Sequence, residues 1–212
     1  MTLWFRLIWL LLTARLRGKV QLFDISVLRL RVLPNDLDFN GHINNGRYFT
    51  LADLGRLDFL IRAGVARVAI ANRAVPLIGD AAGKFRKNLK LFQRYDLQSR
   101  LLGWDDKWTF MEHRFVRDDR VVGVVIIRGQ LRNADGPLSP STWLAGLGLA
   151  QDTALPLLPD WHSLGVGVVM LWERHCAKKS VMRLTKVNNE RRRPWFQKTS
   201  QSSGRSSRPT GR

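Results

Sequence analysis

The sequence predicts an α+β domain in which an antiparallel sheet wraps around one long central helix. Three observations predict it: an alternating strand pattern at residues 26–32, a helical pattern that is apolar on most sides at residues 45–63, and a series of β-rich runs beyond it. Such a helix must be covered on nearly all sides, and a curved sheet can cover it. We expect the domain at residues 25–160, between an apolar N-terminal helix at 1–24 and a basic, largely disordered tail at 161–212.

The first strand and the central helix have clear boundaries. The segment SVLRLRV, residues 26–32, alternates aliphatic and arginine side chains, which is the period of a half-buried strand. Pro34 ends that strand. The helix is expected from about Asn45 to Ala63, with Gly64 as its C-terminal cap.

The remaining strands follow the helix as five runs rich in β-formers: AVPLIGD, KFRKNLKLF, DLQSRLLGW, KWTFMEHRFV and RVVGVVIIRGQLR. Two aspartate pairs, Asp105-Asp106 and Asp118-Asp119, mark tight hairpin connections between them. These runs therefore predict an antiparallel meander. The segment TWLAGLGLAQDTALPLLPDW then predicts a last helix and a proline-rich exit.

The formal net charge of +18 belongs to the two ends of the chain. Six basic residues and one acidic residue lie within residues 1–33, and twelve basic and two acidic residues lie within 173–212, which leaves +3 for the middle. The middle lacks a basic face that would follow a phosphate backbone, so we do not expect it to bind nucleic acid. The tail alone remains a candidate for binding anionic lipid or nucleic acid.

The N-terminal segment is apolar from Leu3 to Leu12 apart from Arg6. This run is shorter than the roughly 20 residues that span a bilayer, and the cations after it do not suit a signal peptide. Two readings stay open: residues 1–20 form a helix that lies peripherally in a membrane interface, or a helix packed on the domain. The single cysteine, Cys176, excludes an intrachain disulfide and favours the cytoplasm.

A polar stretch, PNDLDFNGHINNGRYF at residues 34–49, lies where the first strand leads into the central helix. Helix N-termini present unpaired N–H groups and a partial positive charge, so they can polarise a carbonyl. Gly41 lets a ligand approach the backbone closely, and Asp38 can hold a carboxylate beside that ligand. We therefore expect a substrate carbonyl to bind between these two residues.

The segment DLDFNGHINNGRY, residues 36–48, resembles the D-x-D-x-x-G-H-x-N-N-x-x-Y signature of the hot-dog-fold acyl-CoA and acyl-ACP thioesterases, of the 4-hydroxybenzoyl-CoA thioesterase kind. Residues 31–65 and the segment RLLGWDDKWTFMEHRFV also resemble one branch of that family, thioesterase superfamily member six. The similarity runs from about Ser26 to Leu144. It implies a hot-dog fold and a homodimer or tetramer with acyl-thioester sites at the subunit interface.

The resemblance also implies roles for individual residues. Asp38 falls at the position of the nucleophile or general base, and the backbone of Gly41 and His42 falls where the thioester carbonyl is polarised. Asn44 and Asn45 match the asparagine pair and Tyr48 matches the tyrosine of the signature, and we expect these three residues to contact substrate. A further acid that the family often carries in the helix falls at Asp53, where Glu is the commoner residue.

Each of these residues also has a structural reading. Asp38 is suited to a turn, one of the two asparagines to a helix cap, and Tyr48 to the core. Asp53 can form an ion pair with Arg56 at i+3. Asp36 is read as structural, supporting the turn, and His42 as a participant or as a residue that positions the loop.

A basic run, GKFRKNLKLFQR, supplies Lys84, Arg86 and Lys87 as candidate ligands for the phosphates of coenzyme A. A solvated basic sheet edge is the alternative. No metal-ligand spacing and no cofactor motif is present in the sequence.

The function expected from the sequence is that of an acyl-CoA or acyl-ACP thioesterase of lipid metabolism. The main alternative is a non-catalytic acyl-thioester-binding protein of the same fold at a membrane surface. A hot-dog hydratase is a third reading, but its D-x-N-P-x-H arrangement differs from the spacing of Asp38 and His42 here.

Overall fold

The computed structural model describes residues 2–149, so the predicted tail at 161–212 and the end of the expected domain lie outside the described residues. Five helices or helical turns and one strand come before the long meander: α1 (Thr2–Thr13), η1 (Ala14–Arg17), β1 (Ser26–Arg31), η2 (Pro34–Asp36), α2 (Asn45–Arg62) and α3 (Val65–Ala71). The meander and the last helix are β2 (Val75–Phe85), β3 (Arg94–Trp104), β4 (Thr109–Arg117), β5 (Arg120–Asn133), β6 (Gly136–Leu138) and α4 (Pro140–Gly146).

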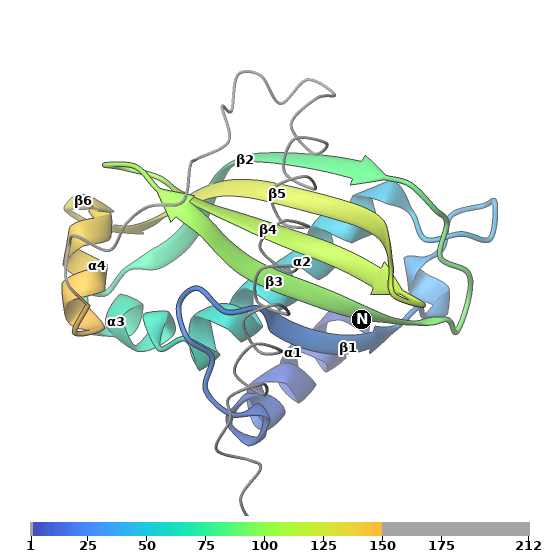
Figure 1. Cartoon of the computed structure of the whole chain (residues 1–212), viewed down its shortest axis with the longest axis horizontal. Coiled ribbons are helices and arrows are strands. Elements are labelled where there is room, and N and C mark those ends of the chain that lie inside the picture. Colours follow the sequence, from blue (N-terminus) through green and yellow to red (C-terminus); the bar gives the residue numbers. More distant parts are fainter. Residues whose placement is uncertain (1, 150–212) are drawn as a thin grey trace, which may run out of the picture. The chain divides into compact units, whose positions relative to one another are not determined.

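One antiparallel sheet curves over α2, as Figure 1 shows. Its strand order is β1-β3-β4-β5-β2, and the short β6 pairs with β5. The helix α1 lies on the other side of α2, next to β1 (Figure 1). The α+β class and the hot-dog arrangement of a sheet around one central helix are thereby confirmed.

The central helix packs very closely on the sheet. Its buried side chains include Tyr48, Leu51 and Phe59, each at most 1% exposed. A Cβ added at Gly55 would overlap the side chains of Ser99 and Leu97 on β3, so the absence of a side chain there lets helix and strand approach. The sheet can therefore wrap around α2 without a gap at this level.

Both predicted hairpins are confirmed. Asp118 and Asp119 have φ angles of 49° and 55°, the left-handed pair required by a two-residue turn between β4 and β5. Asp105 opens the other turn, where its Oδ1 accepts the N–H groups of Lys107 and Trp108 at 2.9 and 2.6 Å. The left-handed backbone of one aspartate pair and the side-chain bonds of Asp105 in the other explain why these pairs predicted the turns correctly.

Two predictions from the sequence need correction. The run KFRKNLKLF is not one strand, because β2 ends at Phe85 and residues 86–93 form a loop. Buried Leu89 fixes that loop, since its carbonyl accepts the N–H of Ile43 at 2.9 Å. The second correction is α3, which the sequence reading missed although its buried Val65, Val68 and Ala69 have helical spacing.

The N-terminal helix α1 has two different apolar faces. The inner face packs on the domain through Leu10 and, beyond the helix, Ala14, both nearly inaccessible to solvent. The outer side carries large apolar side chains that are each at least 50% exposed: Trp4, Phe5, Ile8, Trp9, Leu11, Leu12 and, in the following turn, Leu16. Within residues 2–149, no helix is long and apolar enough to cross a membrane. The packed reading of this helix is therefore confirmed, and its outer face is left without a partner among the described residues.

Candidate functional site

The polar loop lies between η2 and α2, where the sequence predicted it. Leu37 pairs with Ile43 and His42 pairs with Lys90 as isolated antiparallel bridges, so the loop is a narrow hairpin resting on residues 86–93. Gly41 closes its tip with a φ of 72°, a left-handed conformation that favours glycine. The loop thus has a defined shape and leads directly into the helix.

Asp38 is half-buried on this loop, and its carboxylate folds back onto it. Its Oδ1 accepts the N–H of Asn40 at 2.9 Å and the N–H of His42 at 3.3 Å. Its own N–H donates to the carbonyl of His42 at 2.7 Å. One carboxylate oxygen therefore holds the turn, and the described residues supply no hydrogen-bond donor to the other.

The N–H groups proposed to polarise a carbonyl have partners of their own. The N–H of Gly41 donates to the Asp38 carbonyl at 3.1 Å, and that of His42 donates to Asp38 Oδ1. Within the described residues, the N–H of Asn45, the first residue of α2, has no acceptor. The free donor at the start of the helix thus lies three residues after the predicted one.

Asn44 is the N-terminal cap of α2, which confirms the structural reading of one asparagine. Its side-chain Oδ1 accepts the N–H of Gly46 at 2.8 Å, and its φ and ψ of −63° and 136° are extended. The Asn44 side chain thus pairs one of the unpaired N–H groups at the start of α2, that of Gly46. The N–H of Asn45 stays unpaired at the positive end of the helix dipole. The side chain of Asn45 is exposed.

Asp36 sits beneath the loop and is completely buried. Arg6 of α1 binds both of its oxygens, Nη1 to Oδ1 at 3.1 Å and Nη2 to Oδ2 at 2.6 Å. Arg47 of α2 donates to Oδ1 at 3.2 and 2.9 Å, and the N–H of Leu33 donates to Oδ2 at 2.9 Å. Burial raises the pKa of Asp36, but the hydrogen bonds from Arg6, Leu33 and Arg47 outweigh it and hold the pKa below its usual value.

Tyr48 lies in the core. Its ring is 1% exposed and packs against Phe85 and Phe115, with centroids 4.6 and 4.7 Å away. Burial raises the pKa of Tyr48 to about 12, so its hydroxyl stays protonated. Its predicted contact with substrate stays a prediction.

Asp53 lies farther along α2 with a half-exposed side chain, 3.1 Å from Nη1 of Arg56. Burial raises the pKa of Asp53, and the Arg56 charge opposes that rise. No hydrogen bond or ion pair of the described residues joins Asp53 to the Asp38 loop. The ion-pair reading is therefore confirmed, while a catalytic role of Asp53 stays a prediction.

The basic run contributes to a groove of about 360 Å³ beside the loop 86–93. Its lining residues are mostly charged or polar: Lys87, Asn88, Arg117, Asp118, Arg120 and Val122. The N–H groups of Arg86 and Lys87 both donate to the Val122 carbonyl, at 2.8 and 3.1 Å, which places this loop against the start of β5. Lys84 is on β2 and does not line the groove. Sequence reasoning missed Arg117 and Arg120. The pairing of β4 with β5 brings these two side by side, and the pairing of β2 with β5 brings Lys87 to them.

A second, apolar cavity of about 40 Å³ lies between α2 and the sheet. Its walls include Phe59 and Leu60 of α2, Ile78 of β2, Met111 of β4 and Ile127 of β5. Its apolar walls suit hydrocarbon, and its volume holds only a few methylene groups. The described residues contain no group of three or more side chains that could hold a metal ion.

The comparison with known families matches residues 32–151 to the model described as the thioesterase-like superfamily. Among curated relatives, Protein THEM6 of Xenopus laevis is 36% identical over 99 residues, which cover 46% of this chain and 48% of that protein. Protein THEM6 of Danio rerio is 33% identical over 115 residues, covering 51% and 57%. Thioesterase lcsJ of Purpureocillium lilacinum is 28% identical over 114 residues, covering 45% and 37%. The chain thus spans about half, or less, of the length of these relatives.

Solved structures share the fold. A gentisyl-coenzyme A thioesterase superimposes with a TM-score of 0.50 at 21% identity, covering 58% of this chain and 99% of that one. The probable thioesterase YbaW of Escherichia coli superimposes with a TM-score of 0.53 at 18% identity, covering 57% and 94%. At these identities the likeness concerns the fold alone.

Proposed function

This chain belongs to the thioesterase-like superfamily, and from that premise we propose that it hydrolyses an acyl thioester, with Asp38 as nucleophile or general base. One observation carries the proposal. The loop holds the Asp38 carboxylate by one oxygen only, and the N–H of Asn45 is free where α2 begins. Thioester hydrolysis needs a base or nucleophile and a donor for the carbonyl oxygen, and this loop and helix start carry both.

Two routes use these groups. In the single-step route, Asp38 takes a proton from water while the water oxygen bonds to the thioester carbon. The carbonyl oxygen becomes an oxyanion that the Asn45 N–H and the positive end of α2 stabilise. The C–S bond then breaks, and the leaving thiolate takes the proton from Asp38. In the two-step route, an Asp38 oxygen attacks the thioester carbon, the C–S bond breaks and the thiolate leaves, which forms a mixed anhydride. Water then hydrolyses the anhydride to the free acid and the Asp38 carboxylate.

Coenzyme A is the carrier that we propose, with an acyl carrier protein as the alternative. The groove lined by Lys87, Arg117 and Arg120 provides three cations for its phosphates, and the bridge between His42 and Lys90 places this loop next to the Asp38 loop. The apolar cavity under β2 would take part of a fatty acyl chain. Replacing Arg117 and Arg120 by Gln should raise KM for an acyl-CoA severalfold and leave KM for the acyl-pantetheine thioester unchanged. Equal changes for both esters would exclude this groove as the carrier site.

A homodimer, or a tetramer built from it, is supported by the free edge of β2. This strand is eleven residues long and exposes Val75, Leu77 and Ile78, and within residues 2–149 its only partner is β5. A long apolar edge strand is a template for pairing with another chain. Sedimentation equilibrium should show at least a dimer, and Leu77→Lys should shift it to monomer; a monomeric unaltered protein would contradict the assignment.

Peripheral membrane contact is supported by the outer face of α1. Its two tryptophans, Trp4 and Trp9, are exposed, and the exposed cations Arg15 and Lys19 follow the helix. Indoles beside cations suit the headgroup region of an anionic bilayer. Co-sedimentation with vesicles of phosphatidylcholine and phosphatidylserine tests this contact, and failure to sediment would exclude it.

The decisive experiment for catalysis compares two aspartates that make the same kind of turn. Asp38→Asn keeps an oxygen that can accept the Asn40 and His42 N–H groups but loses the charge. Asp105→Asn is the matched control, because Asp105 also accepts two N–H groups within its own turn. Thiol release from acyl-CoA, followed with a thiol-trapping dye, should fall at least about a hundredfold in Asp38→Asn and stay unchanged in Asp105→Asn. Binding of acyl-CoA without thiol release by the unaltered protein would instead support the non-catalytic alternative.

A further inference from the structure

We propose that Arg6, in the N-terminal helix α1, is a positioning residue for the Asp38 loop and acts through the buried carboxylate of Asp36. The inference rests on the proposed function, since it concerns the same site. It assigns to the N-terminal segment a part in catalysis beyond any contact with a membrane.

The first step is the dependence of Asp36 on Arg6. Asp36 Oδ2 accepts only two hydrogen bonds from the described residues, from Arg6 Nη2 at 2.6 Å and from the N–H of Leu33. Arg47 reaches only Oδ1. A completely buried carboxylate that loses one of its cations keeps an under-paired oxygen, which the surrounding chain must move to satisfy.

The second step is the tie between Asp36 and the two ends of the loop. The Asp36 carboxylate accepts the N–H of Leu33 on the strand side, and its backbone carbonyl accepts the N–H of Asn44, the cap of α2, at 2.8 Å. Asp38 follows two residues later. A shift of Asp36 therefore moves both the residue that carries the reactive carboxylate and the cap beside the free Asn45 amide.

The third step is the size of the effect. Reacting groups must be held within a fraction of an ångström, and a misplacement of about 1 Å can reduce the rate by roughly a hundredfold. Arg6 also donates to the Arg31 carbonyl at 2.8 Å, so its guanidinium is fixed between α1, the end of β1 and η2. Its side chain is 9% exposed, which leaves little room for another group to replace it.

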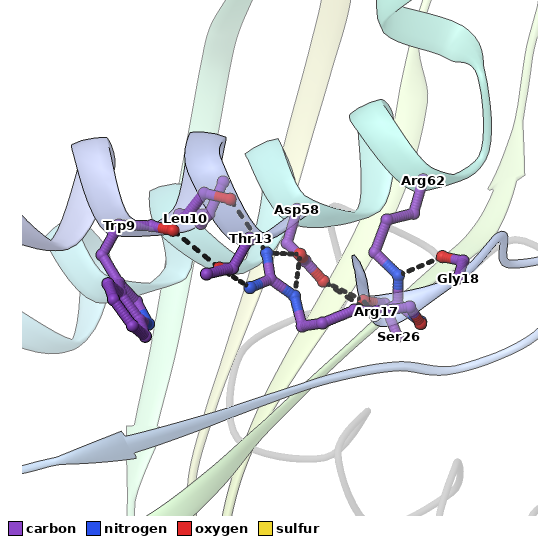
Figure 2. Close-up of polar contacts among 8 residues, drawn as sticks. All are labelled: Trp9, Leu10, Thr13, Arg17, Gly18, Ser26, Asp58 and Arg62. Atoms are coloured by element: carbon purple, nitrogen blue, oxygen red, sulfur yellow. Dashed lines mark hydrogen bonds and ion pairs between the residues drawn. The ribbon is translucent and has the colours of Figure 1, made fainter. Parts of the chain in front are cut away.

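The chain contains a matched control in the same N-terminal segment. Arg17 pairs with Asp58, which is also completely buried, at 2.6 Å (Figure 2). Asp58 lies thirteen residues beyond Asn45 in α2, roughly 20 Å along the helix axis at 1.5 Å per residue. Losing Arg17 therefore removes a comparable buried ion pair of the N-terminal segment at the end of α2 that is far from the Asp38 loop.

The experiment compares Arg6→Gln and Arg17→Gln in the full-length chain, at a temperature well below the unfolding midpoint of both. Arg6→Gln should lower kcat by about tenfold with KM changed less than about twofold, whereas Arg17→Gln should leave kcat within about twofold. Hydrogen exchange of the segment 37–43 should accelerate only in Arg6→Gln. Equal losses of kcat in the two variants, or an unchanged kcat in Arg6→Gln, would overturn the proposal.

A double-variant cycle tests the route through Asp36. Asp36→Asn removes the charge that Arg6 neutralises, so adding Arg6→Gln to it should lower kcat no further. Additive losses would show that Arg6 acts by another route and would overturn the assignment. The exchange measurement keeps this test separate from the test of the function: if the unaltered protein releases no thiol, the proposed function fails, while faster exchange of 37–43 in Arg6→Gln alone still reports that Arg6 positions the loop.

Discussion

Asp36 and Asp58 are two completely buried aspartates with nearly the same surroundings. Each binds one arginine from the N-terminal segment and one from α2: Arg6 and Arg47 for Asp36, and Arg17 and Arg62 for Asp58. They differ in what else they hold. Asp36 lies in the loop and accepts a backbone N–H, whereas Asp58 lies inside α2 and accepts the Ser26 hydroxyl of β1 at 2.5 Å.

The same arrangement, one buried aspartate with two arginines, thus serves two purposes in this protein. Around Asp58, Arg62 donates to the carbonyls of Arg17 and Gly18, and Arg17 donates to that of Leu10, so the contacts in Figure 2 fix the turn after α1 on the central helix. Around Asp36, the contacts fix the loop that carries Asp38. The Asp58 cluster therefore holds a helix in place, and the Asp36 cluster holds a candidate active site.

The largest effects are expected when each of the two carboxylates is removed. Asp36→Ala and Asp58→Ala each leave two arginines facing each other in a buried site, so each should lower the free energy of unfolding by about 3 kcal/mol. Urea denaturation measures this loss. Thiol release per folded molecule should fall only in Asp36→Ala, and a comparable fall in Asp58→Ala would contradict the division of purposes.

A smaller effect is expected from acid. Because the pKa of Asp36 is lower in the folded state than in the unfolded chain, the stability that it contributes is present above the unfolded value of about 3.9 and is lost as the pH falls through the folded value. A single such proton changes the free energy of unfolding by at most about 1.4 kcal/mol per pH unit. Urea denaturation between pH 5 and pH 2 should show that the unfolding free energy depends less steeply on pH in Asp36→Asn than in the unaltered protein. An identical pH dependence would mean that folding does not lower the pKa of Asp36.

The smallest effect on stability is expected on the outer side of α1. Trp4→Gln and Trp9→Gln change exposed side chains that make no ion pair with either aspartate, so the unfolding free energy should move by less than about 0.5 kcal/mol. Vesicle binding should nevertheless weaken severalfold. A clearly larger decrease in the unfolding free energy would show that the outer face of α1 packs on protein.

Local signals made much of the fold predictable. The bounds of α2 followed from an apolar pattern between the Asn44 cap and Gly64. Both hairpins followed from aspartates: Asp105 bonds to its own turn, and Asp118 and Asp119 tolerate the left-handed backbone of theirs. The position of the polar loop was also predictable from a local signal, its cluster of Asp, Asn and Gly residues. The loop at 86–93 was not predictable, because its β-rich composition fits a strand. Tertiary bonds decide otherwise, among them the bond from the Ile43 N–H to the Leu89 carbonyl and those from Arg86 and Lys87 to the Val122 carbonyl.

The site was predictable in its residues and less so in its hydrogen bonds. The motif located Asp38 and the start of α2, but it did not show that Asp38 itself occupies the His42 N–H and leaves that of Asn45 free. The two buried ion pairs join residues 30 and 41 positions apart, and no local pattern identifies such partners. From the sequence alone, Arg6 is therefore an interruption of an apolar run and Arg17 a cation that follows it.

The two-sided character of α1 has a practical consequence for handling the protein. Deleting the apolar first twenty residues is the obvious way to make the protein more soluble. The deletion would remove one arginine from each of the two buried aspartates and expose part of α2. Replacing the exposed Trp4, Phe5 and Leu12 with glutamine or glutamate makes the outer side of α1 polar and leaves the ion pairs to Asp36 and Asp58 in place. Surface redesign is thus the way to purify the molecule with its loop intact.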